Sequence, residues 1–475
     1  MLRSPSLLDA RVWVAHPRAW LVIQAAVLIL LTLVLIDLLS GGKRELVLGG
    51  LVGGLCALWI IHKPHWGVLI ISAAWFVQLD FAAGIPYAVS AILLIALGLS
   101  VLRDRAIWVL HVPQIKILLL IGILFLISTW WSEFKYPITL RPQEDETIRL
   151  MREFAVHLAW LVFLLYFITT RERIELTTWL MLGLITVAAL SALPAFLASG
   201  GGRRAAAAFS FAANSNRLAY ICLFATTLLW YYRFHGQTHR WKVWTLPFLC
   251  LLPVIALAAG SRSGLLQMLA LTAFVAKDQK GWSAAKRMCC VVFIGLVAFL
   301  ALTVVPATFI ERVTTFDPDA QAAGQESLQN RRRVVLNALK MVASDPIFGA
   351  GIGNFPWVAP SFFGSRGHTH NSYLWALTSG GIGVFGLYLL LFYVTQRMLK
   401  QLEASEEREL LWLSKGLRVN LFLFLIFSGF ADVWLSDFLY LIVGLTVAMT
   451  RIQQQQQKEL VVVRSGRLRS PAWSG

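Results

Sequence analysis

Residues 115–131 read IKILLLIGILFLISTWW, a run of 17 residues that contains one charge, Lys116. A transmembrane helix needs about 20 predominantly apolar residues to cross a hydrocarbon layer roughly 30 Å thick. Comparable runs recur along the whole chain of 475 residues, of which 58% are hydrophobic and 14% are charged. The sequence therefore predicts an all-α polytopic membrane protein. It excludes an outer-membrane barrel, whose strands alternate apolar and polar residues.

The apolar runs also predict how the chain is divided. Fourteen candidate spans cover residues 19–40, 46–61, 67–83, 87–102, 115–131, 154–170, 176–198, 218–234, 244–260, 264–276, 288–309, 371–396, 417–433 and 438–450. The runs at 264–276 and 438–450 are short, so we expect about 12–14 transmembrane helices. The predicted parts are a bundle of about eleven spans (1–309), a large loop containing helices (310–370), three further spans (371–450) and a disordered tail (451–475).

The distribution of basic residues predicts the orientation. With the N-terminus in the cytoplasm, most of the 42 Lys and Arg residues fall on the cytoplasmic side, as the positive-inside rule requires. The loop 310–370 and the turn at Ser261–Ser263 then face the periplasm, and both termini lie inside. The net charge of +17 follows from this topology and from contact with anionic lipid, so it does not call for nucleic-acid binding.

Several classes of site are missing from the sequence. It contains no Walker A, HExxH or CxxC pattern, so we expect neither ATP as an energy source nor a metal or other cofactor. The five cysteines lie inside apolar runs and are expected to be buried small hydrophobes. They are Cys56, Cys222, Cys250, Cys289 and Cys290.

Basic and small polar residues gather instead around the predicted periplasmic mouth. The turn Gly260–Gly264 places Arg262 at the membrane interface, where an arginine is costly unless it faces a polar cavity or binds an anion. Its planar fork suits the oxygens of a pyrophosphate. The alternative is a turn arginine bonded to backbone carbonyls or lipid headgroups.

The loop 310–370 holds a second basic group. Arg331, Arg332 and Arg333 open a stretch in which apolar residues recur at helical spacing, which predicts an amphipathic helix over the mouth. The apolar residues are Leu328, Val335, Leu339 and Val342. A solvated charged face is the alternative interpretation of the arginine run.

Further polar residues flank predicted spans. The glycine-rich turn Asp345–Phe355 is followed by His368, His370 and Asn371, and a histidine there can act as a general base. Asn214–Arg217 precedes the span 218–234, where the Asn and Ser residues also suit a helix N-cap. Three carboxylates near spans, Asp80, Asp432 and Asp437, have no assigned role.

In this order, the pieces resemble the O-antigen ligase/polymerase superfamily of bacterial membrane glycosyltransferases. The resemblance covers roughly residues 200–450 and rests on Asn214–Arg217, Ser261–Gly264, the arginine-led loop with Asp345–Phe355, and His370–Asn371 followed by Gly380–Gly383. It implies a GT-C-like helical fold in the inner membrane. It also implies metal-independent, inverting transfer of a glycan from undecaprenyl pyrophosphate at the periplasmic face.

The resemblance also implies roles for single residues. Arg262 and either Arg331 or Arg332 match the arginines that hold the pyrophosphate, and His370 matches the histidine that activates the acceptor hydroxyl. We add five expected substrate-binding residues from the same mouth: Asn214, Arg217, Arg333, His368 and Asn371. Lipid A–core is the expected acceptor of a ligase, and a second lipid-linked glycan that of a polymerase. A lipid-linked glycan transporter is less favoured, because the polar groups gather at one face.

Overall fold

The computed structural model describes ten stretches of the chain. These are residues 44–77, 85–104, 108–136, 144–198, 214–236, 242–279, 325–363, 368–404, 410–433 and 436–467, with scattered positions between 282 and 299. The described residues form helices, turns and loops, with no strand among them. The predicted span 19–40 and most of 288–309 lie outside these stretches.

Each predicted span that falls on described residues coincides with a helix. The helices are α3 (Arg44–His62), α4 (Pro64–Val77), α5 (Ile85–Asp104), η2 (Trp108–His111, 3-10), α6 (Pro113–Lys135), α7 (Glu144–Phe167), α8 (Arg171–Ser191), α9 (Leu193–Ala198), α10 (Ser215–His235), α12 (Thr245–Ala258), α13 (Arg262–Asp278), α16 (Gln325–Ser344), α17 (Phe355–Phe363), α18 (Ser372–Glu403), α19 (Leu411–Ser428) and α20 (Asp437–Arg467). The all-helical fold class is therefore confirmed.

Five of the described helices are long and apolar enough to cross a membrane. They cover Pro113–Lys135, Glu146–Phe167, Arg171–Ala198, Ser372–Glu403 and Leu411–Ser428. A sixth span is possible if Gly53–His62 and Pro64–Ala74, which meet at an angle of 119°, count as one. The chain is thus a polytopic membrane protein, and the larger expected number of about 12–14 spans stays a prediction.

Helix α10 lies at the centre of the bundle. Every residue from Leu218 to Tyr232 is buried. A helix that is hydrophobic all round needs neighbours on all sides, and α10 packs against α8, α12, α13 and α19. The packed body of α10 therefore fixes the position of its first turn, which carries the polar residues of the motif Asn214–Arg217.

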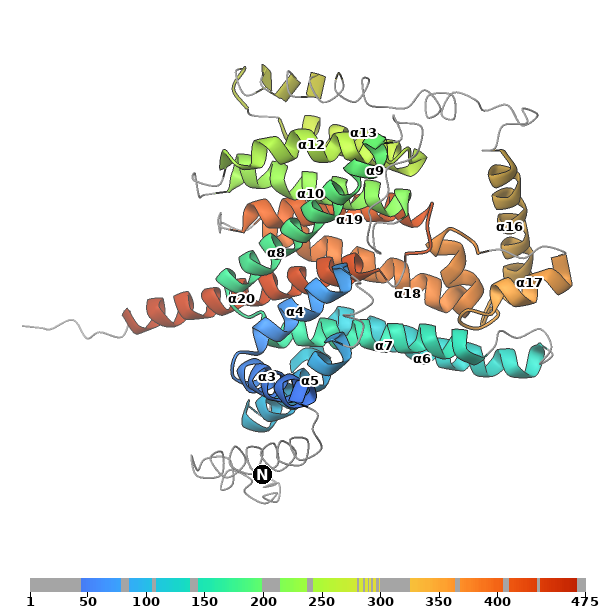
Figure 1. The fold of residues 1–475 in the computed structure, drawn as a ribbon, viewed down its shortest axis with the longest axis horizontal. Helices are drawn as coiled ribbons and strands as arrows, with labels where there is room; N and C mark the ends of the chain where they lie inside the picture. The colour runs from blue at the N-terminus through green and yellow to red at the C-terminus, as the bar shows by residue number, and fades with distance from the viewer. Residues whose placement is uncertain are drawn as a thin grey trace, which may run out of the picture.

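Most of the long helices lie side by side, and one helix crosses their end. In Figure 1, α6, α10, α18, α19 and α20 run along the long axis of the molecule, while α16 runs across it beside α17. The helices α16 and α17 belong to the predicted loop 310–370, so this loop does contain helices. Its location on the periplasmic side remains a prediction.

The C-terminal part differs from the prediction. We expected a disordered tail from residue 451, but α20 continues as far as Arg467 and includes Gln453–Gln457. The physical reason is that glutamine and lysine are good helix formers, and extending an existing helix costs far less than starting one. Figure 1 shows this end of α20 projecting beyond the bundle.

The prediction that the cysteines are buried is confirmed only in part. Cys222 and Cys290 are buried, whereas Cys250 is half-buried and Cys56 is exposed on α3. Cys289 lies outside the described residues. The expectation of burial is therefore wrong for Cys56. Its neighbours in the sequence are apolar, but Cys56 itself lies on the exposed face of α3.

Candidate functional site

The turn around Ser261 and the entry to α10 form one hydrogen-bonded unit. Ser261 caps α13, because its hydroxyl accepts a hydrogen bond from the Gly264 N–H at 3.1 Å. The same hydroxyl donates to the Asn216 side-chain oxygen at 2.7 Å and lies 2.9 Å from the Ser263 hydroxyl. Gly264 permits the close approach, since a Cβ there would lie 2.8 Å from the Ala219 Cβ. The sequence motifs Asn214–Arg217 and Ser261–Gly264 are thus in direct contact.

Two predicted arginines begin the helices of this unit. Arg262 is the first residue of α13 and Arg217 the third residue of α10, and both are partly buried. A cation at a helix N-terminus opposes the helix dipole, whereas an anion there is stabilised by the dipole and the free N–H groups. This arrangement suits an anionic ligand. Asn214, in contrast, is the N-cap of α10, with its side chain accepting from the Asn216 N–H at 2.9 Å.

The segment Asp345–Phe355 is anchored to the end of α6. The Asp345 carboxylate, which is 7% exposed, accepts from Lys135 at 2.9 Å and from the Trp131 indole at 3.2 Å. Further along, the Asn354 amide donates to the Ser132 hydroxyl at 3.0 Å. These polar contacts show a structural role for the segment: it ties the end of α16 to a membrane-spanning helix.

The glycines after His370 allow the same segment to dock into α18. The helix is broken at Gly380 and Gly381, and Gly381 has a φ of 66°. The Ile382 N–H donates to the Pro346 carbonyl at 2.8 Å, and a Cβ on Gly381 would lie 2.0 Å from the Ile347 oxygen. Only glycine fits at such a point. Gly349, Gly351 and Gly353 also have positive φ values, of 67°, 86° and 75°.

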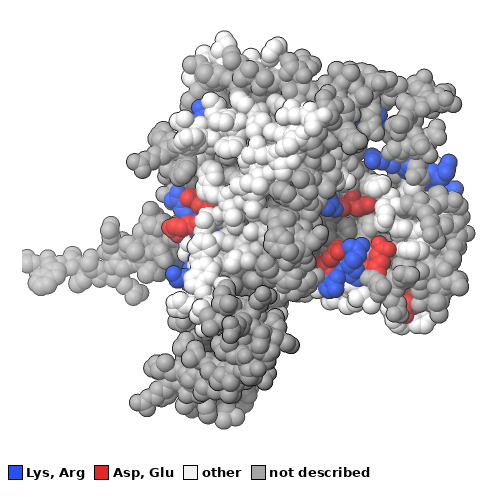
Figure 2. All heavy atoms as spheres, in the orientation of Figure 1, with Lys and Arg blue, Asp and Glu red and all other residues white. Residues whose placement is uncertain are grey.

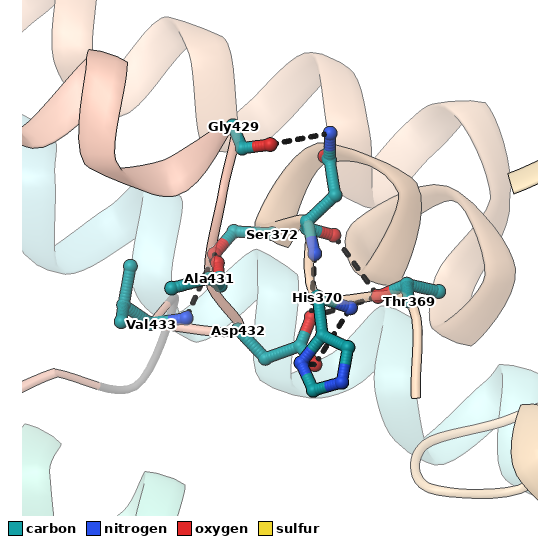
Figure 3. Close-up of polar contacts among 8 residues, drawn as sticks. Thr369, His370, Ser372, Gly429, Ala431, Asp432 and Val433 are labelled. Atoms are coloured by element: carbon teal, nitrogen blue, oxygen red, sulfur yellow. Dashed lines mark hydrogen bonds and ion pairs between the residues drawn. The ribbon is translucent and has the colours of Figure 1, made fainter. Parts of the chain in front are cut away.

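The loop before α18 is held by a carboxylate that the sequence left without a role. Asp432, in the connection between α19 and α20, accepts three hydrogen bonds (Figure 3). They come from the Thr369 hydroxyl at 2.7 Å, the His370 N–H at 3.1 Å and the Asn371 N–H at 2.9 Å. The sequence signal was a carboxylate at the end of a span, which is costly there and usually functional.

Asn371 fixes the start of α18. Its side-chain oxygen accepts from the Tyr373 N–H at 2.9 Å and the Leu374 N–H at 3.1 Å. Its amide donates to the Gly429 carbonyl at 3.1 Å. The predicted substrate-binding residue Asn371 therefore has its side chain occupied by an N-cap and by the end of α19.

His370 lies in a strained and accessible position. Its φ of 47° is the one positive value among the described residues other than glycine. Strain of this kind costs about 1–3 kcal/mol and persists where surrounding contacts enforce it. The side chain is 54% exposed, and its Nδ1 lies 4.0 Å from the Asp432 carboxylate. The His368 ring lies nearby, at 6.5 Å between ring centroids.

The surroundings of His370 favour its neutral form. Burial lowers the pKa of this histidine below its usual value of 6.5, and the charges of Arg331 and His368 lower it further. Asp432 acts in the opposite direction and raises the pKa. Because the lowering influences prevail, the ring is mainly neutral at neutral pH and can accept a proton.

Arg331 is the arginine of the loop that acts on His370. It is partly buried, whereas Arg332 and Arg333 are exposed. Among the three arginines, only the charge of Arg331 contributes to the pKa of His370. Partial burial and its effect on the pKa of His370 single out Arg331 among the three arginines, and Arg332 and Arg333 lie on the exposed face of α16.

The apolar face of α16 differs from the predicted one. Val334, Ala338 and Met341 are buried, in contrast to Leu339, which is 49% exposed. Val335 and Val342 are half-buried at the edge of this face, and the side chain of Leu328 lies outside the described residues. The predicted helix is present as α16, and what differs is the set of residues that is buried. Both sets recur at helical spacing, and the buried set includes an alanine, which counts little in hydropathy.

Aromatic packing places the arginines that begin α10 and α13 at the same end of the bundle as His370. Tyr220, one turn into α10, stacks on Phe427 near the end of α19 at 4.7 Å and meets Phe438 at the start of α20 at 5.3 Å. The Asp432 connection joins these two helices. Arg217 and Arg262 therefore lie at the end of the bundle that holds His370. Figure 2 shows the charged side chains gathered toward opposite ends, with uncharged side chains between them.

Within the described ranges, no group of three or more His, Cys, Asp or Glu side chains is arranged to hold a metal ion. The cations of the candidate site are arginines, whose guanidinium groups suit the oxygens of an anionic ligand.

Comparison with known proteins identifies the region that contains most of this site. Residues 246–391 match the model of the O-antigen ligase family. No curated protein matches the chain. The matched region includes Arg262, Arg331 and His370, whereas Asp432 and Arg217 lie outside it. The resemblance predicted from the motifs is therefore confirmed over residues 246–391, and a domain of this family implies glycosyl transfer of ligase or polymerase type.

Proposed function

We propose that this chain, with its O-antigen ligase domain over residues 246–391, transfers a glycan from undecaprenyl pyrophosphate to lipid A–core. The reaction takes place at the periplasmic face of the bacterial inner membrane, and both termini are cytoplasmic. The observation that carries the proposal is the strained, accessible His370, which Asp432 holds through its backbone and whose neutral form is favoured beside the charge of Arg331.

The proposed chemistry uses one base and several fixed cations. Neutral His370 takes the proton of the acceptor hydroxyl as that oxygen attacks the anomeric carbon of the donor sugar. The bond from this carbon to the pyrophosphate oxygen breaks on the opposite face, so the configuration inverts and the electron pair leaves with the pyrophosphate. Arg262 and Arg331 stabilise the developing charge without a metal ion. Protonated His370 then releases its proton to water.

The residues of the site have different proposed roles in this reaction. Arg217 and Arg262, at the starts of α10 and α13, bind the pyrophosphate together with the helix N-termini. His368 contacts the substrate beside His370. Asn214 and Asn371 act through the backbone as N-caps, and Arg332 and Arg333 contribute a general positive potential.

A polymerase is the second candidate, because the matched family includes ligase-type and polymerase-type enzymes that use the same donor. A polymerase would pass the growing glycan to a second lipid-linked unit. The two candidates share every residue named above and differ only in the acceptor. A transporter is disfavoured by the gathering of the motif residues at one end of the bundle, since transport needs polar groups along a path through the membrane.

The test is glycan transfer by the purified full-length protein in nanodiscs, with EDTA present throughout. The donor is a glycan-loaded undecaprenyl pyrophosphate, and lipid A–core and a second lipid-linked glycan are offered as separate acceptors. We expect glycan on lipid A–core, and its loss in Arg262→Ala and His370→Ala. Lys277→Ala, at the far end of the same helix as Arg262, and His65→Ala are the matched controls and should retain transfer.

The outcomes separate the candidates. Lengthening of the glycan on the lipid carrier would establish the polymerase instead. No transfer to either acceptor, from a donor shown to bind, would contradict the proposal. Transfer that survives in His370→Ala would contradict the assignment of the base.

A further inference from the structure

A second histidine–aspartate pair lies in the bundle, apart from the site described above. His157 of α7 and Asp437, the first residue of α20, lie 2.5 Å apart between Nε2 and Oδ1. Their side chains are 13% and 10% exposed. The His157 ring also packs on Tyr440, with 5.1 Å between ring centroids. The proposed reaction makes no use of this pair.

The hydrogen bonds of His157 determine how many protons the pair carries. Its Nδ1 lies 2.6 Å from the Glu153 carbonyl oxygen, which can only accept, so Nδ1 must donate. The contact at Nε2 then needs a proton as well, either on the ring or on the Asp437 carboxyl. In both arrangements the pair holds two protons and no net charge. This suits a buried position, and loss of either ring nitrogen leaves a buried polar group without its partner.

Short contacts connect this pair to the loop that carries His370. Ser436, which precedes Asp437, donates its N–H to the Val433 carbonyl at 2.8 Å. The Val433 N–H donates to the Ser372 hydroxyl at 2.8 Å, and that hydroxyl donates to the Ala431 carbonyl at 2.7 Å (Figure 3). Ala431 and Val433 are therefore bonded to the start of α18, while Ser436 bonds to Val433 and Asp437 pairs with α7.

The same connection contains Asp432, whose hydrogen bonds hold the backbone of His370 and Asn371. Asp432 is only five residues from Asp437 along the chain. A shift of the Asp437 end would move Asp432, and with it the ring of His370. Displacements of this size matter, because misplacing a reacting group by about 1 Å can cost about 100-fold in rate.

We propose that His157 is a positioning residue for His370 and acts through Asp437, Ser436 and the hydrogen-bonded residues 431–433. This positioning role depends on the proposed function in one respect, which is that His370 is the reacting base. Its structural part, that breaking the pair moves His370, can be tested without any glycan transfer.

The first readout is the reactivity of His370 toward diethyl pyrocarbonate at one fixed pH. The full-length protein in nanodiscs is treated, and the modification of His370 is followed by mass spectrometry of its peptide. His157→Phe keeps an aromatic ring against Tyr440 but removes both ring nitrogens. His65→Phe, beside Trp66 on α4, is the matched control. We expect the rate at His370 to change in His157→Phe and not in His65→Phe.

A second variant keeps the test decisive if His157→Phe does not fold. His157→Gln/Asp437→Asn replaces the pair by two neutral amides that can hydrogen-bond to each other. We expect the double variant to restore the wild-type rate at His370, whereas Asp437→Leu alone does not. An unchanged rate at His370 in folded His157→Phe or folded Asp437→Leu overturns the proposal.

The second readout is glycan transfer, and it separates this proposal from the function itself. We expect folded His157→Phe to lower kcat by about 10–100-fold with the donor KM unchanged. A parallel loss of donor binding would overturn the positioning role, because it would indicate a general structural change. If wild type transfers no glycan but the reactivity of His370 still responds to His157, the proposed function fails and the positioning contact stands.

Discussion

Charged side chains are used differently at the two ends of the bundle. At the end away from the candidate site, Asp278 pairs with Lys415 at 3.8 Å and Glu403 pairs with Arg418 at 2.6 Å. Each pair joins two helices, and the positive and negative charges balance. At the site end, Asp432 instead accepts hydrogen bonds from a loop, and its ring contact with His370 is longer, at 4.0 Å.

This difference separates stability from chemistry. Paired charges that connect helices hold the bundle together and leave little charge for a ligand. A carboxylate bonded to backbone N–H groups fixes a loop and leaves the neighbouring histidine ring accessible. We therefore expect substitution of Asp432 to change the rate and its pH dependence, and substitutions within the two ion pairs at the other end to change stability alone.

Among the substitutions that compare the two ends of the bundle, the largest effect is expected for Asp432→Asn. The amide cannot accept all three hydrogen bonds of the carboxylate as strongly, so His370 moves and transfer falls by about 10–100-fold. Because Asp432 raises the pKa of His370, its removal lowers that pKa, and the acidic limb of the pH–rate profile shifts to lower pH. The rate of transfer against pH measures both. A wild-type rate at the plateau would show that Asp432 does not position the base.

A smaller effect, on stability, is expected for Arg418→Gln at the opposite end. Glu403 is 13% exposed and would lose its cationic partner, which costs about 1–2 kcal/mol. The melting temperature in nanodiscs should fall, while kcat and the pH profile stay at wild-type values. A shift of the pH profile in this variant would break the distinction between the two ends.

The smallest expected change is a shift in the pH dependence of transfer, which is compared between Arg331→Gln and Arg332→Gln apart from any loss of rate that Arg331→Gln causes by removing a cation from the pyrophosphate site. The charge of Arg331 lowers the pKa of His370, so its removal raises that pKa and moves the acidic limb to higher pH. Arg332 is exposed and makes no such contribution, so its removal leaves the limb in place. The two pH–rate profiles provide the measurement. Equal shifts in both variants would mean that the charge of the whole arginine run acts on His370.

Local pattern predicted the helices well because membrane spans are encoded by local composition. The same pattern placed Arg262 and His370 beside the starts of predicted spans and Arg331 on a helix of the loop between spans. In the structure Arg262 begins α13, His370 lies just before α18, and Arg331 lies on α16. It could not assign Asp432, since the bonds of this carboxylate join residues about sixty positions apart. Contacts of that range leave no periodic signal in the chain.

Two other differences have equally physical causes. The sequence identified the glycines at 380–383 as a motif but not their role. In the structure they let Pro346 and Ile347, from a turn distant in sequence, approach the backbone of α18 closely. The glutamine run was read as a tail because it is polar, although helix propensity favours its continuation as α20. Polarity alone distinguishes membrane from water and does not distinguish helix from coil.

The most direct test of the central proposal, that His370 is the base, is a single-turnover measurement with donor already bound. His370→Gln and wild type are loaded with glycan-linked undecaprenyl pyrophosphate, the donor affinity of each is measured, and acceptor is then added. We predict unchanged affinity and a transfer rate lower by about 100–10,000-fold, the range of general base catalysis. A rate equal to that of wild type at equal donor occupancy would contradict the assignment of His370.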